Sequence, residues 1–202
     1  MVEDLTTKYA NCMLEIKGRT NVIDSILKRA CSLRISTPDV EFIALQLRKS
    51  LEFVVFSNLV ANIDIYKQMY ASYKEDWNLK KIVKRIRKIN PEYYPKPIKS
   101  DLITVSSGGE QVLSLESLEE GFIAEAEFIA AYELTNKIIH VDNPYGKRRD
   151  LSEMLERLVN YFYRLVCLLK IHQVKLINRD RVICNMGATI EDKPSVTYLT
   201  PL

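Results

Sequence analysis

The sequence predicts a mainly α-helical protein, a single domain over residues 1–202, in which a bundle of about five helices carries a small antiparallel β-sheet. Three observations lead to this fold class. Glycine supplies only 6 of the 202 residues, about half of its usual share of roughly 7%. Long stretches repeat apolar residues at steps of three and four, as one face of a helix does. The C-terminal segment instead alternates apolar and polar residues, as a strand does.

The first predicted helix covers residues 2–33. Its apolar stripe consists of Leu5, Tyr9, Cys12, Ile16, Ile23, Ile26 and Ala30. Arg19 stands where this stripe calls for an apolar residue, and Gly18 beside it weakens the helix locally. Arg19 is therefore a charge that has to find a partner inside the fold.

A second helix is predicted over residues 38–69. Thr37 can cap its start, Pro38 suits the first turn, and Asp39 favours the positive end of the helix dipole. This helix is apolar nearly all round through residues 53–56, which predicts a central, buried position.

A third helix is predicted over residues 74–89. We expect Trp77, Ile82 and Ile86 on its inner face and its lysines and arginines outside. Residues 90–97 hold three prolines and predict an extended connector.

A β-hairpin and a fourth helix are predicted next. Segments 102–105 and 111–115 flank a glycine turn. Ser117 and Glu120 match a capping box that would open a helix running to about His140.

Residues 143–146 fit a tight turn, and Asp150 opens a fifth helix with regularly spaced leucines. Three later segments alternate as strands do: 174–177, 181–184 and 195–199. Because a lone ribbon is marginal in water, we expect these strands of the 173–202 tail to join the 102–115 hairpin in one sheet that packs on the helical part, 1–172.

Composition excludes several classes. The net charge is 29 − 26 = +3, and the apolar and charged fractions are those of a globular protein. The first five residues carry acids where a signal peptide needs positive charge, and the most apolar stretch, 51–61, is too short and too polar to span a bilayer. The sequence therefore predicts a soluble, cytoplasmic protein that does not contact membranes.

The cysteines and the motif search favour no metal and no cofactor. The four cysteines, Cys12, Cys31, Cys167 and Cys184, have no metal-ligand spacing. The first three fall on apolar faces of predicted helices, which favours burial as small hydrophobic residues. No nucleotide-binding loop, nucleophile elbow, zinc-protease motif or calcium-binding loop occurs.

Charge is arranged in two opposite blocks. Residues 80–99 hold eight basic residues and one acid, a local charge of +7, and residues 100–136 hold eight acids without a lysine or arginine, a local charge of −8. A basic helix face followed by two tyrosines could bind a nucleic-acid strand, because cations track phosphates and aromatic rings stack on bases. The residues of this predicted surface are Lys80, Lys81, Lys84, Arg85, Arg87, Lys88, Tyr93 and Tyr94. The alternative is a solvated face that the acidic helix neutralises within the fold.

His140 is the candidate catalytic residue. It ends a predicted helix four residues after Asn136, on the same face, and Arg148 and Arg149 follow shortly after the tight turn. A histidine at a helix C-terminus titrates near neutrality, so this group could act as acid or base on a phosphodiester. Alternatively, His140 only caps its helix. The other histidine, His172, is expected to be structural or on the surface.

The segment 47–52 in a buried helix, followed by 136–140 at the end of another, resembles the HEPN superfamily. That resemblance implies a small helical bundle, a homodimer, and a metal-independent ribonuclease site built from two copies of an Arg-x4–6-His motif in defence or toxin systems. Asn136 and His140 match the polar residue and the histidine of the motif. Residues 133–135 hold no arginine, so the resemblance implies an inactive relative or one in which Arg148 or Arg149 substitutes.

Arg19, Arg48 and Glu52 are candidate buried charges. A buried arginine needs a partner, which predicts an Arg19–Glu52 or Arg48–Glu52 ion pair, and the alternative is an anion pocket built on the two arginines. Two functions therefore stay open: a HEPN-like homodimer that binds or cleaves RNA, and a non-enzymatic interaction protein whose ligand is a protein partner.

Overall fold

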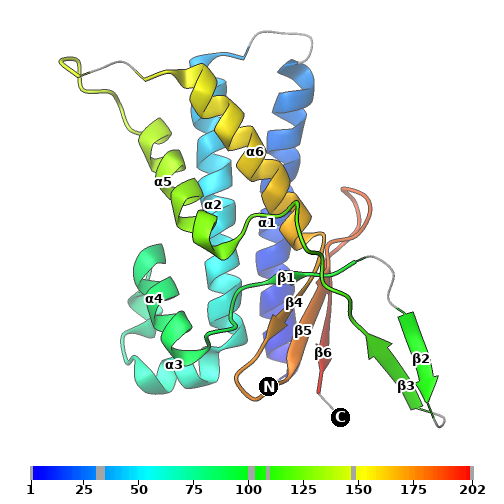
Figure 1. Ribbon diagram of the computed structural model, residues 1–202. Helices are drawn as coiled ribbons and strands as arrows, with labels where there is room; N and C mark the ends of the chain where they lie inside the picture. Colours follow the sequence, from blue (N-terminus) through cyan, green and yellow to red (C-terminus); the bar gives the residue numbers. More distant parts are fainter. Residues whose placement is uncertain (1, 31–34, 100–102, 108–109, 147–148, 201–202) are drawn as a thin grey trace.

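The computed structural model describes residues 2–30, 35–99, 103–107, 110–146 and 149–200. Two long antiparallel helices, α1 (Val2–Ala30) and α2 (Thr37–Ala61), form its centre (Figure 1). Their facing sides fill the core with fully buried side chains: Tyr9, Met13, Ile16 and Ile23 from α1 and Ile43, Leu47, Leu51 and Val54 from α2. The mainly helical class with a small sheet is confirmed.

Helix α2 begins and ends with a side-chain hydrogen bond to its own backbone. Ser36 is the cap, one residue before the predicted Thr37, and the Asp39 carboxylate accepts from the Ser36 backbone N–H at 3.1 Å. The predicted helix 38–69 is interrupted at Asn62, whose backbone leaves the helical region and whose side-chain amide donates to the Asn58 carbonyl at 2.8 Å. A separate short helix, α3 (Ile63–Met69), follows.

Helix α4 (Leu79–Ile89) starts later than the predicted residue 74, because Asn78 caps it and accepts from the Lys81 backbone N–H at 3.0 Å. A short 3₁₀ turn, η1 (Tyr73–Glu75), precedes it. Trp77 lies before the cap and is 79% exposed, so the expectation that it faces the core is wrong.

Helix α5 (Glu125–Ile139) also starts later than predicted. Ser117 does not cap it, because this residue pairs with Ile98 in a β-bridge. The capping acid is Glu127, which accepts from the Ala124 backbone N–H at 3.2 Å. Helix α6 (Leu151–Leu169) starts where predicted, with Asp150 as its cap.

The main sheet has four antiparallel strands in the order β1 (Lys96–Pro97), β4 (Ile171–Lys175), β5 (Arg181–Asn185) and β6 (Ser195–Leu199). The predicted 102–115 hairpin is present as β2 (Ile103–Ser107) and β3 (Glu110–Ser114), but it forms a separate sheet that projects away from the helices (Figure 1). The expectation of one shared sheet is therefore wrong. Residues 96–97 of the proline-rich connector, rather than the hairpin, pair with β4 and form one edge of the main sheet.

His172 of β4 is buried, in agreement with the structural role expected for it. Cys184 is buried as well, Cys12 and Cys167 are half-buried, and Cys31 lies outside the described residues. None of the helices in the described part of the chain is long and apolar enough to cross a membrane.

Candidate nucleic-acid interface

Helices α4 and α5 run antiparallel and are joined by two ion pairs. Near the start of α4, Lys80 Nζ lies 2.5 Å from Glu133 Oε1, and near its end Arg87 Nη2 lies 2.6 Å from Glu125 Oε1. The acidic helix therefore neutralises part of the basic face within the fold.

Two further cations of α4 are held by Asp76, whose side chain is 2% exposed. Lys81 Nζ lies 2.9 Å from its carboxylate, Arg85 pairs with the other oxygen, and the Tyr66 hydroxyl donates to it at 2.9 Å. Burial opposes ionisation of this carboxyl, but hydrogen bonds from Lys81 and Tyr66 and the charge of Arg85 lower the pKa of Asp76 below its ordinary value. The Arg85 guanidinium also lies 4.3 Å from the centre of the Tyr70 ring. Lys81 and Arg85 are thus fixed in place by the turn before α4.

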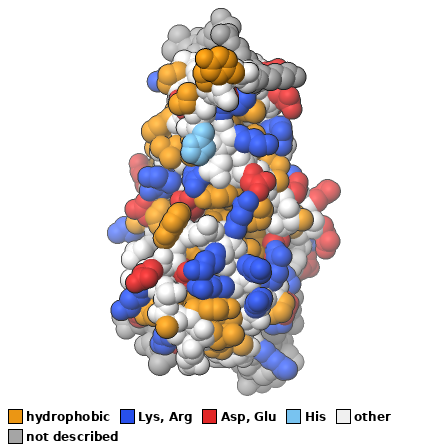
Figure 2. All heavy atoms as spheres, turned by 90° about the vertical axis from the view of Figure 1, so that its left-hand side faces the viewer, with side chains coloured by type: hydrophobic (Ala, Val, Ile, Leu, Met, Phe, Trp, Pro, Cys, Tyr) orange, Lys and Arg blue, Asp and Glu red, His pale blue; other side chains and the backbone are white. Residues whose placement is uncertain are grey.

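Lys84 and Lys88 have no carboxylate partner among the residues that the structure describes. They border a groove of about 540 Å³ between α4 and α5, lined by Lys80, Val83, Lys84, Arg87, Lys88 and Ile129. Figure 2 shows the face that carries these helices, where lysine and arginine side chains gather around exposed apolar side chains. The four lining cations and the two carboxylates that pair with Lys80 and Arg87 leave a charge of 4 − 2 = +2.

The two tyrosines predicted to stack on bases lie inside the fold. Tyr93 is 2% exposed and its hydroxyl donates to Glu125 Oε1 at 2.8 Å. Tyr94 is half-buried, and its hydroxyl donates to the Ile123 carbonyl at 2.9 Å. The buried Tyr93 ring is not presented to a ligand, so its predicted stacking role is wrong.

Trp77 presents an exposed aromatic ring beside this groove, two residues before α4. The sequence analysis does not identify it as a surface residue, because the helix predicted over 74–89 includes position 77, and Trp77 continues the apolar spacing of that helix. The Asp-Trp-Asn order is the signal that was available, since Asn78 is a strong cap and places Trp77 outside the helix. Ile129, the apolar residue that α5 contributes to the groove, is half-buried.

The candidate catalytic residues lie at the C-terminal end of α5. His140 is exposed and follows the last helical residue, and Asn136 is half-buried. Arg149 donates to the His140 carbonyl at 2.7 Å and pairs with Asp142, so its guanidinium is engaged by two residues that follow the end of α5. Arg148 lies outside the described residues.

Helix periodicity relates these residues to the groove. Glu125, Ile129, Glu133, Asn136 and His140 follow one another at steps of four, four, three and four, so they share one face of α5. The first three contact α4 or line the groove. Because the two helices are antiparallel, Asn136 and His140 extend this face beyond the N-terminal end of α4, the end that carries Trp77.

Arg48 and Glu52 form the predicted pair, with Arg48 Nε 3.1 Å from Glu52 Oε1, but both side chains are half-buried, so the expectation of a pair buried in the core is wrong. Tyr132 of α5 completes the contact, because its hydroxyl accepts from Arg48 at 2.5 Å and donates to Glu52 at 3.2 Å. Arg19 does not reach Glu52 and instead bonds to Glu15 at 2.9 Å and to Gln46 at 3.0 Å. The two arginines are therefore engaged separately, Arg48 between α2 and α5 and Arg19 between α1 and α2, and they do not converge on an anion pocket.

Within the described ranges, no three histidine, cysteine, aspartate or glutamate side chains are placed to hold a metal ion. Comparisons with known protein families, with curated protein sequences and with solved structures find no match to this chain.

Proposed function

We propose that this chain binds single-stranded RNA along the groove between α4 and α5. The observation that carries the proposal is the pair Lys84 and Lys88, two exposed lysines without a carboxylate partner in the described structure, which flank an apolar groove floor. Unpaired cations attract phosphates, and apolar or aromatic surfaces contact bases. Trp77 supplies an exposed ring at one end of α4.

The size of the surface favours a short single strand. The 11 residues of α4 extend over about 16 Å, the length of a few nucleotides. The resemblance to HEPN ribonucleases favours RNA over DNA, and the groove geometry supports strand binding of either kind.

Anisotropy of a labelled 12-nucleotide RNA tests the proposal. The double reversal Lys84→Glu/Lys88→Glu is expected to weaken binding about tenfold or more at low salt and to reduce the salt slope by about 2, because each lysine neutralises one phosphate. The matched control is Lys49→Glu/Lys193→Glu, two exposed lysines that line no part of this groove. Equal weakening by the control, or no RNA binding by the unaltered chain at low salt, would contradict the proposal.

A second variant separates stacking from charge. Trp77→Ala is expected to weaken binding about tenfold through the lost stacking of a base, while the salt slope stays unchanged because no cation is removed. A Trp77→Phe variant keeps a ring and should retain most of the affinity.

The same bound RNA tests the catalytic role predicted for His140. Cleavage in the presence of EDTA that His140→Ala abolishes, with an unchanged melting temperature, would add a metal-independent ribonuclease activity to RNA binding. RNA that stays intact with every protein would remove the catalytic role and leave the binding function standing.

A further inference from the structure

A separate cavity of about 270 Å³ lies between α1, α6 and the loop that follows β5. Apolar side chains such as Val166 and Met186 form much of its wall, and among the described residues that line it the charged ones are Lys17 and Lys170. This volume equals that of about nine water molecules at ~30 Å³ each, which is enough space for a small organic molecule.

Lys17 is a buried cation that the surrounding protein only partly satisfies. Lys17 is 8% exposed, and its Nζ donates to the carbonyls of Met186 at 2.5 Å and Asp192 at 2.7 Å. An ammonium group has three N–H donors, so one remains. No ion pair joins Lys17 to a carboxylate in the described structure. The Asp192 side chain accepts from the Thr189 backbone N–H at 2.7 Å, and its charge acts on Lys17 only from beyond ion-pair distance. A buried positive charge of this kind is stabilised by an anion.

The loop over the cavity is fixed by its own hydrogen bonds. The Met186 N–H donates to the Lys170 carbonyl at 3.0 Å, and the Gly187 N–H donates to Asn185 Oδ1 at 2.9 Å. Together with the two bonds from Lys17, these contacts hold the wall in place without a ligand, and such preformed, mainly apolar cavities with a few polar groups are typical of small-molecule sites.

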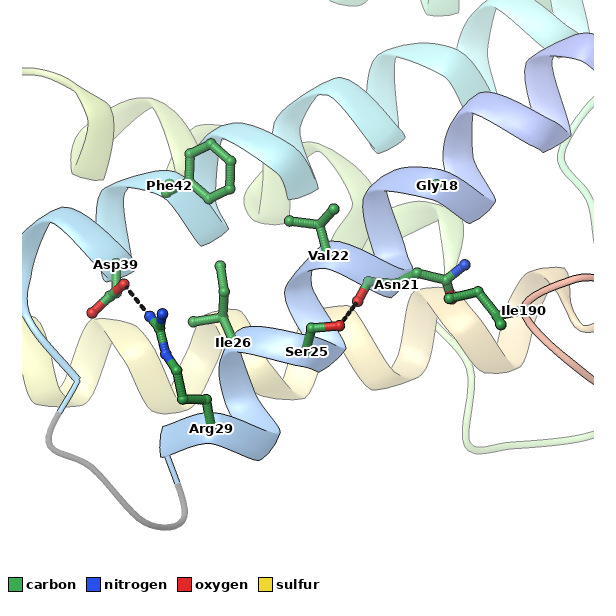
Figure 3. Close-up of a pocket in the computed structure, with 9 residues that line it drawn as sticks. All are labelled: Gly18, Asn21, Val22, Ser25, Ile26, Arg29, Asp39, Phe42 and Ile190. Atoms are coloured by element: carbon green, nitrogen blue, oxygen red, sulfur yellow. Dashed lines mark hydrogen bonds and ion pairs between the residues drawn. The ribbon is translucent and has the colours of Figure 1, made fainter.

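The cavity continues into an apolar groove on the surface. Asn21 and Ile190 line the cavity and also one end of a groove of about 810 Å³ between α1 and α2. Figure 3 shows this groove, with Val22, Ile26 and Phe42 directed into it between the two helices. Val22 is 40% and Phe42 43% exposed, and a methyl group built on Gly18 would meet no atom within 4 Å, so the path along α1 is open.

We propose that this cavity binds an amphipathic anion, a carboxylate with an acyl chain. The carboxylate accepts the remaining hydrogen bond of Lys17, with Lys170 as a second cation at the wall. The chain lies against Val166 and passes Ile190 into the groove beside Phe42. This site is distinct from the α4–α5 surface and does not depend on RNA binding.

Calorimetric titration of the full chain with octanoate, and with octan-1-ol as the uncharged match, tests the head-group contact. Octanoate is expected to bind at one site about tenfold or more tightly than octanol, and Lys17→Met is expected to remove this difference. Because Lys17→Met also releases two loop carbonyls, Val166→Trp serves as a second variant that fills the cavity from α6. Tyr163→Trp, an exposed residue one turn earlier that lines neither cavity nor groove, is its control.

Titration with dodecanoate below its micelle concentration tests the path of the chain. Each additional buried CH₂ tightens binding by up to about fourfold, so dodecanoate should bind more tightly than octanoate, and Phe42→Ser should reduce that gain without changing octanoate binding. Octanoate that binds no better than octanol, or that binds Val166→Trp as well as the unaltered chain, would overturn the proposal.

Discussion

Tyr9 and His172 are hydrogen-bonded to one another inside the core, with Tyr9 Oη 2.8 Å from His172 Nε2. Both side chains are fully buried, and they join the N-terminal third of α1 to strand β4. His172 Nδ1 lies 3.0 Å from the Leu169 carbonyl, which can only accept. Nδ1 therefore carries the proton, and Nε2 of the neutral ring accepts from the tyrosine hydroxyl.

This pair predicts a loss of stability in mild acid. Burial lowers the pKa of His172 to about 4, while a histidine in the unfolded chain titrates near its ordinary pKa of 6.5. The unfolded state thus binds more protons between these two values, so stability from this group is complete above pH 6.5 and falls as the pH drops toward 4. The gap corresponds to about 3 kcal/mol.

Urea unfolding from pH 7.5 to 4 measures this effect, with His172→Gln as the reference for all other titrating groups. The free energy of unfolding of the unaltered chain should fall by about 3 kcal/mol more than that of His172→Gln across this range. Parallel pH curves for the two proteins would show that His172 is protonated in the folded state as easily as in the unfolded one.

Asp76 is expected to be the most sensitive acidic position of the α4 region. Asp76→Ala should lower the free energy of unfolding by about 3 kcal/mol, since it leaves Arg85 and the Tyr66 hydroxyl without their buried acceptor. Asp64→Ala removes an exposed pair with Lys67 and should cost less than about 1 kcal/mol. Thermal and urea unfolding check both variants, and similar small losses would mean that the Asp76 cluster contributes no more than a surface pair.

The Arg48–Tyr132–Glu52 contact should contribute less than a fully buried ion pair. The side chains of Arg48 and Glu52 are 23% and 28% exposed, so water partly solvates either charge when its partner is removed. Glu52→Gln and Tyr132→Phe are each expected to cost about 1 kcal/mol, and their double variant less than the sum because they share one network. A loss of 3 kcal/mol for Glu52→Gln alone would indicate that the pair is as desolvated as Asp76.

The sequence was most informative where one strong signal fixes an element locally. Asp150 and the leucine spacing after it place α6 correctly, and the prolines of 90–97 correctly exclude a helix. Local signals failed where one residue could be used in two ways. Ser117 and Glu120 match a helix start, yet the backbone at Ser117 is used in a bridge to Ile98, and only the assembled sheet reveals that competition.

The site was harder to predict than the fold because burial depends on distant partners. Tyr93 follows a basic helix in the sequence, but in the fold its ring is buried. Its hydroxyl donates to Glu125, a partner 32 residues later in the chain. His172 has its partner Tyr9 163 residues away. The unpaired state of Lys84 and Lys88, on which the proposed function depends, follows from the antiparallel register of α4 and α5 and is not encoded in either helix alone.

Gly187 is expected to be the least replaceable glycine among the described residues. Its φ is +80°, and a Cβ added to it would lie 2.4 Å from Asp192 Cβ. Gly121 has a similar φ of +84°, but the nearest atom to an added Cβ is Cys167 Sγ at 3.9 Å. Gly121→Ala should therefore cost about 1 kcal/mol for the left-handed backbone alone, whereas Gly187→Ala must also move the backbone of the 186–192 loop. We expect Gly187→Ala to lose the hydrogen-exchange protection of the Thr189 amide, which donates to Asp192, while Gly121→Ala keeps it. Equal protection of that amide in the two variants would show that the loop adapts to the added methyl group without releasing Asp192.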